Sequence, residues 1–198
     1  MGIGQKSQLT PASNARVGDR VLMTKGPAIE AVGLLACQAE VSLKKKIGNE
    51  TVERAKKYLL QMTVVEDALT AAPLSHAMHD ATEGGLLNGV FEIAAASKTG
   101  VTIYEDKIVI PDEIAVVCRS FNIDPLISIS EGTLVITAEP GNSGKIINEL
   151  KKRSIDAWDI GEITKGERLF IRKGGGKIVL EPVLVDPFWP AFFSAAEG

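Results

Sequence analysis

The amino-acid sequence predicts an α+β domain in which helices flank a mixed β-sheet. Segments with helical spacing of apolar residues and segments with strand-like alternation are mixed along the chain without a strict order. One strand–helix–strand stretch in the second half resembles half of a ferredoxin-like unit. The chain has 198 residues, 45% of them hydrophobic and 24% charged, so it is long enough to bury a core.

The first half of the chain is predicted to hold one strand and four helices. Residues 1–16 are polar and glycine-rich and are expected to be a flexible lead-in. Pro27 suits the first turn of a helix. Residues 74–78 are expected to be a connection, and Gly100 is expected to be the left-handed cap of the fourth helix. The predicted strand spans 21–24, and the predicted helices span 27–36, 50–62, 64–72 and 86–97.

The second half is predicted to be richer in strands. Alternating residues on both sides of Glu131 and Gly132 predict one hairpin, and the glycine run 174–176 predicts the turn of another. Pro140 is expected to interrupt the chain before a helix that Ser143 caps. Strands are predicted at 101–104, 108–110 and 157–163, helices at 111–121 and 144–153, and hairpins at 127–130 with 134–137 and 169–172 with 177–180.

Bulk properties exclude several classes of protein. The net charge is −3 and no basic stripe is present, so we expect no nucleic-acid partner. No segment is long enough to span a membrane and no signal peptide begins the chain. Cys37 and Cys118 stand far apart in apolar stretches, which predicts two buried free thiols, a cytoplasmic location and no structural zinc site. We therefore predict no metal site within this chain.

The run from His79 to Leu86 is the strongest candidate for a functional site. It places an imidazole, the carboxylates of Asp80 and Glu83 and the hydroxyl of Thr82 before two glycines, Gly84 and Gly85, that precede a long apolar helix. Glycines there let the backbone approach a ligand, and the N–H groups of a helix start favour an anion such as phosphate. The alternative interpretation is structural, because Asp and Thr are common helix caps and Gly-Gly is a common turn.

Several stretches together resemble the C-terminal domain of the aminoimidazole ribonucleotide (AIR) synthase superfamily. This superfamily includes AIR synthase, formylglycinamidine ribonucleotide synthase, selenophosphate synthetase, thiamine-monophosphate kinase and the hydrogenase expression/formation maturation protein. The resemblance is greatest to the last branch and its AIR synthase-related relatives. The matching stretches occur in the family order at residues 17–24, 78–86, 92–94, 123–126, 130–134 and 160–163.

The resemblance implies an incomplete ATP-dependent enzyme. Members of the family use ATP to activate an oxygen or selenium atom by phosphorylation, and their N-terminal domain carries most ligands for ATP and magnesium. The expected partners are therefore that N-terminal domain or a separate subunit, a small-molecule substrate, and a second copy in a homodimer. Under this interpretation, residues 1–16 are a linker from the N-terminal domain, 17–182 form the C-terminal domain, and 183–198 form an aromatic tail.

The resemblance also implies which residues bind ligand. Asp80, Thr82, Gly84 and Gly85, together with His79 and Glu83, would line the cleft between the two domains and hold phosphate or substrate groups. Glu131 and Gly132 match a second loop near that cleft. Lys25 and Glu30 match a pattern of the related branch, and Lys25 would offer a positive charge to the same ligand. The alternative for Lys25 and Glu30 is a surface ion pair.

Three functions remain open at this level. The first is an ATP-dependent enzyme domain that needs its N-terminal half. The second is a non-catalytic binding or assembly module related to hydrogenase maturation. The thiocyanate-making proteins carry a carbamoyl group on a C-terminal cysteine, and here no cysteine follows Cys118. The aromatic tail around Phe188 and Trp189 would then dock on a partner rather than on its own domain. The third is a stand-alone hydrolase using Asp80 and Glu83. No catalytic residue is assigned.

Overall fold

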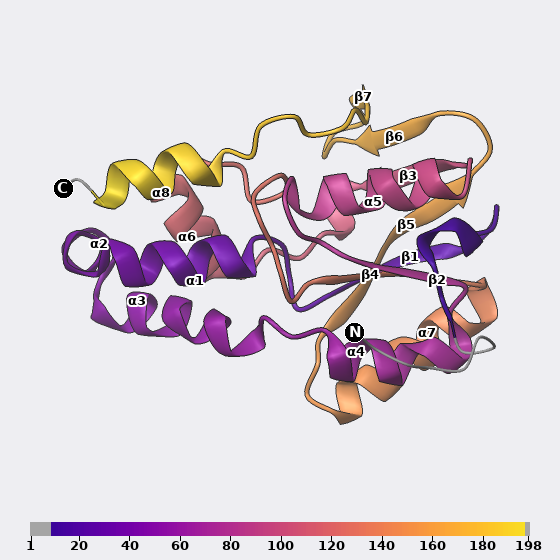
Figure 1. Cartoon of the computed structure of the whole chain (residues 1–198), viewed down its shortest axis with the longest axis horizontal. Coiled ribbons are helices and arrows are strands. Elements are labelled where there is room, and N and C mark those ends of the chain that lie inside the picture. The colour runs from indigo at the N-terminus through magenta and orange to yellow at the C-terminus, as the bar shows by residue number, and fades with distance from the viewer. Residues whose placement is uncertain (1–8, 197–198) are drawn as a thin grey trace.

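A mixed seven-stranded sheet forms the centre of the computed structural model, which describes residues 9–196 (Figure 1). The strand order is β2-β4-β1-β5-β3-β6-β7, and only β3 and β6 run parallel as neighbours. The predicted α+β class is confirmed. The strands are β1 (Arg20–Thr24), β2 (Ala77–Asp80), β3 (Gly100–Tyr104), β4 (Leu134–Ala138), β5 (Ala157–Thr164), β6 (Arg168–Ile171) and β7 (Lys177–Val179).

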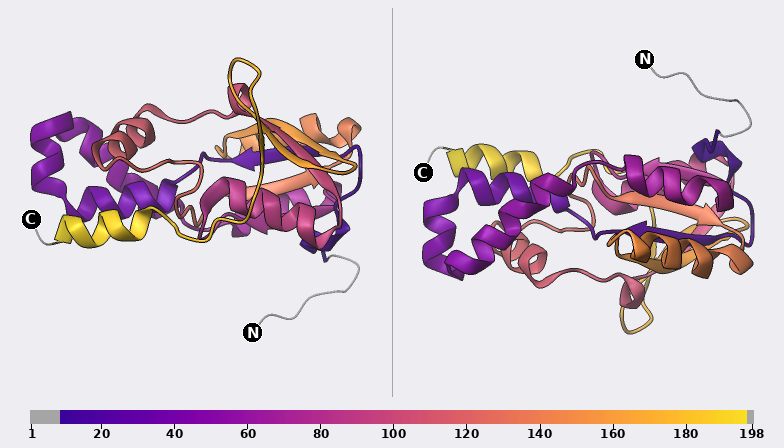
Figure 2. Two further views of the ribbon diagram at one scale, coloured as in Figure 1. Left: turned by 90° about the horizontal axis from the view of Figure 1, so that it is seen from above. Right: turned by 90° about the horizontal axis from the view of Figure 1, so that it is seen from below.

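Helices cover both faces of the sheet and form a separate cluster at one end. Helices α4 and α7 pack together on one face and α5 covers the other, while α1, α2, α3, α6 and α8 make up the end cluster (Figures 1 and 2). Among the described residues, no helix is long and apolar enough to cross a membrane. The helices are α1 (Ile29–Gln38), α2 (Glu40–Ile47), α3 (Asn49–Lys56), α4 (Val65–Ala71), α5 (Gly85–Ala96), α6 (Asp112–Ser120), α7 (Pro140–Lys152) and α8 (Phe188–Ala196), with short 3-10 turns η2 (Ala12–Asn14), η3 (Lys57–Gln61), η4 (Ala72–Leu74) and η5 (Glu105–Lys107).

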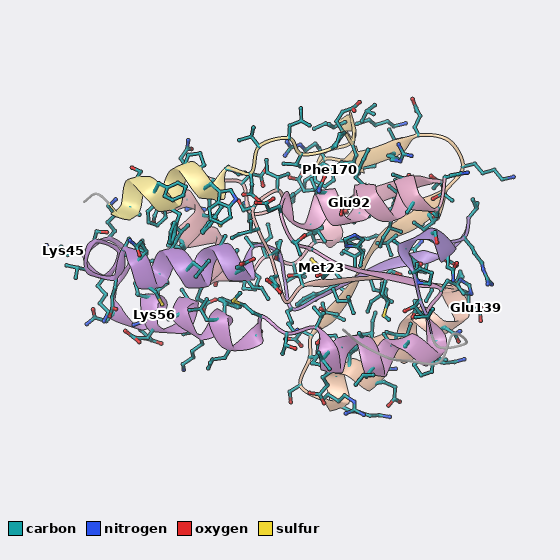
Figure 3. The ribbon with its side chains drawn as sticks, viewed as in Figure 1. Met23, Lys45, Lys56, Glu92, Glu139 and Phe170 are labelled. Carbon is teal, nitrogen blue, oxygen red and sulfur yellow. The ribbon has the colours of Figure 1, made fainter. Side chains whose placement is uncertain are left out.

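Strand β1 shows why a central strand of this sheet carries consecutive apolar residues. Val21 and Met23 belong to the core beneath α5, and Leu22 belongs to the core beneath α4 and α7. Figure 3 shows Met23 near the middle of the molecule. Because side chains alternate between the two faces of a strand, a sheet covered on both faces needs an uninterrupted apolar run.

The predicted ferredoxin-like part is present as β4, α7 and β5. Strands β4 and β5 both pair antiparallel with β1, which lies between them, so they run parallel to each other. Such a split strand–helix–strand unit is characteristic of ferredoxin-like folds. Its helix begins at Pro140, where the prediction placed a break, because proline fits the first position of a helix that needs no N–H there.

Two predicted strands are wrong, although their apolar residues are buried. Residues 108–110 and 127–130 lie outside the sheet, where Ile108 and Ile129 pack into the cores. The second segment satisfies its polar groups locally: the Ser128 hydroxyl donates to the carbonyl of Asp124 at 2.7 Å. The apolar side chains of these segments are buried in the cores, and local hydrogen bonds satisfy polar groups that strand pairing would otherwise satisfy.

Strand β2 and the start of β3 also differ from the prediction. The connection predicted at 74–78 becomes strand from Ala77 onward, because β2 pairs with β4. The left-handed residue after α5 is Lys98, with φ of 57°. Gly100 instead begins β3, where a Cβ atom would lie 2.5 Å from the carbonyl oxygen of Glu167. Close approach of two backbones, not a helix cap, requires this glycine.

Both ends of the described chain pack against the domain. Residues 1–8 of the predicted lead-in lie outside the described residues, but Ala15 is buried and the N–H of Met78 donates to the carbonyl of Thr10 at 3.1 Å. At the other end, α8 lies along α1 and Phe188 is fully buried (Figure 2). The aromatic tail therefore docks on its own domain, one of the two expected arrangements.

The two cysteines differ in exposure, which corrects the prediction of two buried thiols. Cys37 is exposed because it lies off the apolar stripe of α1, whereas Cys118 is buried in α6 and burial raises the pKa of its thiol to about 12. Since the thiolate is the reactive form, we expect one thiol per chain to react with Ellman's reagent in the native state and two in denaturant. The variant Cys37→Ser should show no native reaction. A native reaction of both thiols would contradict this assignment.

Candidate functional site

The edge strand β2 and the helix α5 hold the predicted loop between them. Asp80 is the last residue of β2 and lies opposite Leu134 in β4. The N–H of Ala81 then donates to the carbonyl of Thr133 at 2.9 Å, which fixes the chain as it leaves the sheet. The loop turns at once into α5, whose apolar side is buried beneath the sheet. The start of α5 is thereby held at the rim of the sheet.

Gly84 and Gly85 are required by the geometry of this turn. Their φ angles are 78° and 63°, which side chains disfavour. A Cβ atom on Gly85 would lie 2.5 Å from the carbonyl oxygen of Ser128. The sequence predicted a close backbone approach at these glycines. The close neighbour of Gly85 is the chain's own 127–130 segment.

A carboxylate of the chain itself occupies the predicted anion position. The N–H of Gly84 donates to Oδ2 of Asp186 at 2.8 Å, and the N–H of Phe188 donates to Oδ1 at 2.9 Å. Burial raises the pKa of Asp186, while these two N–H groups lower it. The N–H of Gly84 at the start of α5 is therefore occupied by the chain's own carboxylate, which the sequence did not predict, and phosphate binding there stays a prediction.

Asp186 belongs to residues 183–187, which we call the C-terminal strap, and two more hydrogen bonds hold the strap and the residues after it against the loop and α5. The N–H of Val183 donates to Oδ1 of Asn88 at 3.1 Å. Just beyond the strap, the indole N–H of Trp189 donates to Oε1 of Glu83 at 2.9 Å. The strap thus crosses directly over the loop and the first turn of α5.

His79 faces the flank of α5 rather than its start. Its Nε2 lies 3.1 Å from Oε2 of Glu92, and its Nδ1 lies 2.6 Å from the carbonyl oxygen of Asp80 (Figure 3 labels Glu92). Both ring nitrogens are therefore engaged by the chain. The side chains of Thr82 and Glu83 are exposed beside the strap, whereas Gly84 and Gly85 are buried.

Glu30 connects the second predicted loop, at Glu131 and Gly132, with the region around Asp186. Oε2 of Glu30 accepts the N–H of Glu131 at 3.0 Å. Burial raises the pKa of Glu30, and the negative charges of Glu131, Asp186 and Glu83 raise it further. The two loops and the strap therefore meet in one acidic region.

Lys25 binds the loop of Glu131 and Gly132, and none of its hydrogen bonds or ion pairs within residues 9–196 involves the loop 79–85. Its Nζ pairs with Oδ2 of Asp67 at 2.9 Å and donates to the carbonyls of Thr63 and Gly132, each at 2.8 Å. The side chains of Lys25 and Asp67 are 10% and 2% exposed. The predicted surface pair of Lys25 with Glu30 is therefore wrong. Four acceptors of the chain surround the ammonium, the carbonyl of Gln61 at 3.4 Å being the fourth, and a buried carboxylate neutralises its charge.

The acidic side chains do not assemble a metal site. Within residues 9–196, no group of three or more His, Cys, Asp or Glu side chains is positioned to hold a metal ion. Magnesium prefers an octahedral shell of oxygen ligands. The described residues therefore offer too few clustered donors to hold magnesium by themselves.

The fold and the loop now define the class of protein. Residues 16–174 match the family described as "AIR synthase related protein, C-terminal domain", and the chain belongs to that family. A Methanocaldococcus jannaschii protein named for hydrogenase expression/formation, MJ0676, is 25% identical over 190 residues, which cover 94% of this chain and 55% of that protein. Carbamoyl dehydratase HypE of Azotobacter vinelandii is 25% identical over 171 residues, covering 83% and 48%.

Solved structures share the fold at lower identity. HypE in complex with ATP has a TM-score of 0.66 at 20% identity, covering 90% of this chain and 55% of that one. Thiamine-monophosphate kinase of Stenotrophomonas maltophilia has a TM-score of 0.68 at 19% identity, covering 87% and 55%. The chain thus spans about half the length of these relatives.

Proposed function

We propose that this chain forms one wall of an ATP-dependent activation cleft whose loop 79–85 binds a phosphate or another anionic group. The observation that carries the proposal is the carboxylate of Asp186 bound to the N–H of Gly84 at the start of α5. That N–H group and the helix dipole there favour negative charge. Relatives solved with ATP, and with an ATP analogue and a kinase substrate, support a nucleotide as the source of the phosphate.

The acidic surroundings indicate that the other wall must supply positive charge. Glu83 and Glu30 act on Asp186, and Glu131 acts on Glu30, so an approaching phosphate meets repulsion. Lys25 does not relieve it, because Asp67 neutralises its charge. Basic side chains or a metal ion bound by the remaining half of an AIR synthase-like protein would supply the missing charge. This chain alone should therefore bind nucleotide weakly.

In this proposal each loop residue has a limited task. The N–H of Gly84 donates a hydrogen bond to a phosphate oxygen, and the exposed Thr82 hydroxyl donates a further one. Asp80 and His79 shape the edge of the site from β2, and Lys25 fixes the loop of Glu131 and Gly132. Phosphorylation of an oxygen atom would take place between this wall and the nucleotide held mainly by the other half.

A nucleotide titration tests this proposal. Adding the magnesium complex of a non-hydrolysable ATP analogue should shift the amide NMR signals of residues 82–88, with a millimolar dissociation constant. Thr82→Val should weaken binding up to about tenfold, since one hydrogen bond contributes roughly 0.5–1.5 kcal/mol. Thr51→Val, in α3 of the end cluster, is the matched control and should leave the affinity unchanged. Equal affinities of wild type and Thr82→Val, or no shift at these amides, would contradict the proposal.

An assembly module is the second candidate. Trp189 and Phe193 remain 39% and 60% exposed on α8, although Phe188 beside them is buried. A complex of HypE with HypF is among the similar solved structures, with a TM-score of 0.60 at 22% identity. If this face binds a second copy, sedimentation should show a dimer that Phe193→Asp converts to a monomer. A wild-type monomer at all concentrations would exclude a homodimer through this face.

A further inference from the structure

We propose that the C-terminal strap inhibits the site: Asp186 occupies the position of the ligand's anion, and phosphate binds only after the strap moves away. This inference rests on the proposed function of the loop. It goes further, because it assigns to residues 183–187 the control of access to that loop.

The first observation is the way in which the carboxylate is held. Asp186 spans two backbone N–H groups that are distant in sequence, Gly84 at 2.8 Å and Phe188 at 2.9 Å. Asp186 is only 7% exposed. A phosphate oxygen bound to Gly84 would require the same N–H and the same space. The two anions therefore exclude each other.

The second observation is that the strap is anchored at its ends and lightly packed between them. Leu180 before it and Phe188 after it are buried, whereas Leu184 and Val185 are 89% and 74% exposed. Little apolar surface is therefore lost if the middle of the strap lifts. The strap can leave the start of α5 while α8 keeps its place on α1.

The third observation is the charge around the carboxylate. Asp186 lies with Glu83 and Glu30 in one acidic region, and burial adds to the unfavourable environment of its charge. Backbone N–H groups, first of all those of Gly84 and Phe188 and then that of Ile129, stabilise the charge of the carboxylate in this place. A ligand that brings cations with its phosphate would relieve this repulsion and compete effectively.

The variant Asp186→Ser separates the two hydrogen bonds of the carboxylate. Serine is a favoured N-cap, so it can still accept the N–H of Phe188 two residues on, and α8 should stay formed. Its short side chain cannot also span to Gly84, so that N–H becomes free for phosphate. Asp186→Asn is the second variant if the first fails to fold, because it keeps the size of the side chain and removes its charge.

The test measures tripolyphosphate binding at fixed ionic strength by calorimetry and by the NMR shift of the Gly84 amide. We expect Asp186→Ser to lower the dissociation constant at least tenfold and to give a saturable Gly84 shift. Glu181→Gln is the matched control, since it removes one exposed charge two residues before the strap but leaves the hydrogen bond to Gly84 in place, and its dissociation constant should change less than threefold. Circular dichroism verifies that α8 persists.

The outcomes distinguish this inference from the proposed function. If wild type and Asp186→Ser bind tripolyphosphate equally well at the Gly84 amide, the strap does not inhibit, and the proposed anion site stands. If Glu181→Gln gains as much as Asp186→Ser, general repulsion explains the gain and the inference is overturned. If neither wild type nor any variant shifts the Gly84 amide, both the inference and the proposed phosphate site are wrong.

Discussion

Replacing Gly132 by alanine is expected to lower the free energy of unfolding by about 4 kcal/mol. Gly132 has φ of 100°, which is unfavourable for a residue with a Cβ atom. That Cβ would lie 2.3 Å from the carbonyl oxygen of Gln61 and 2.7 Å from Cα of Met62. These are backbone atoms, so no side-chain rotation removes the overlap. A typical domain has a stability of roughly 5–15 kcal/mol, so a large part of it would be lost.

Gly18→Ala is the matched control for this prediction. Gly18 has nearly the same φ, 96°, but nothing lies within 4 Å of the position of its Cβ. Only the backbone strain of about 1–2 kcal/mol remains in that variant. Urea unfolding followed by circular dichroism measures both values. Equal losses in the two variants would show that strain alone, and not the packing of this loop against η3, requires glycine at 132.

Sequence periodicity predicted the helices that bury one face. Helix α5 is the clearest case, because Leu86, Val90 and Ile93 recur at helical spacing and all lie in the core beneath the sheet. Strand β5 was predicted equally well, and so was the β6–β7 hairpin across its glycine run. In these elements, the local pattern and the tertiary packing favour the same structure.

Periodicity failed where pairing decides the structure. Strand β2 is a short edge strand with two polar residues, His79 and Asp80, and it exists because β4 supplies its hydrogen bonds more than fifty residues later. Ile127 to Ser130 alternates like a strand, yet the loop of Gly85 packs against its backbone at Ser128. Neither fact is contained in the local sequence, since strand propensity depends strongly on context.

In the candidate site, too, some features follow from the local sequence and others depend on contacts between distant parts of the chain. The glycines and the helix start were predictable from local composition, because positive φ and free N–H groups belong to the loop itself. The carboxylate that occupies the site comes from Asp186, 102 residues later in the chain. An Asp-Pro-Phe sequence signals a turn or a cap for the following helix, as it does for Phe188, but nothing in it indicates a contact with Gly84. Long-range capping of this kind is visible only in the fold.

Lys25→Met is expected to destabilise the chain by about 3–5 kcal/mol, because it leaves the carboxylate of Asp67 buried without its partner. Lys25 holds that carboxylate at 2.9 Å, and the other oxygen of Asp67 has no hydrogen-bond partner among the described residues. The double variant Lys25→Met, Asp67→Leu should regain most of the loss, since a buried ion pair is often replaceable by apolar side chains.

Guanidinium unfolding of the wild type, both single variants and the double variant gives the coupling energy, expected to be at least about 2 kcal/mol. Lys44→Met is the control, because Lys44 pairs with Glu40 and Glu53 at the surface, where we expect a far smaller loss. Additive losses in the double variant would mean that the ion pair does not explain the burial of Lys25. The bonds of its ammonium to the carbonyls of Gln61, Thr63 and Gly132 would then serve mainly to fix the Gly132 loop, and nucleotide affinity would fall in both variants that lack Lys25.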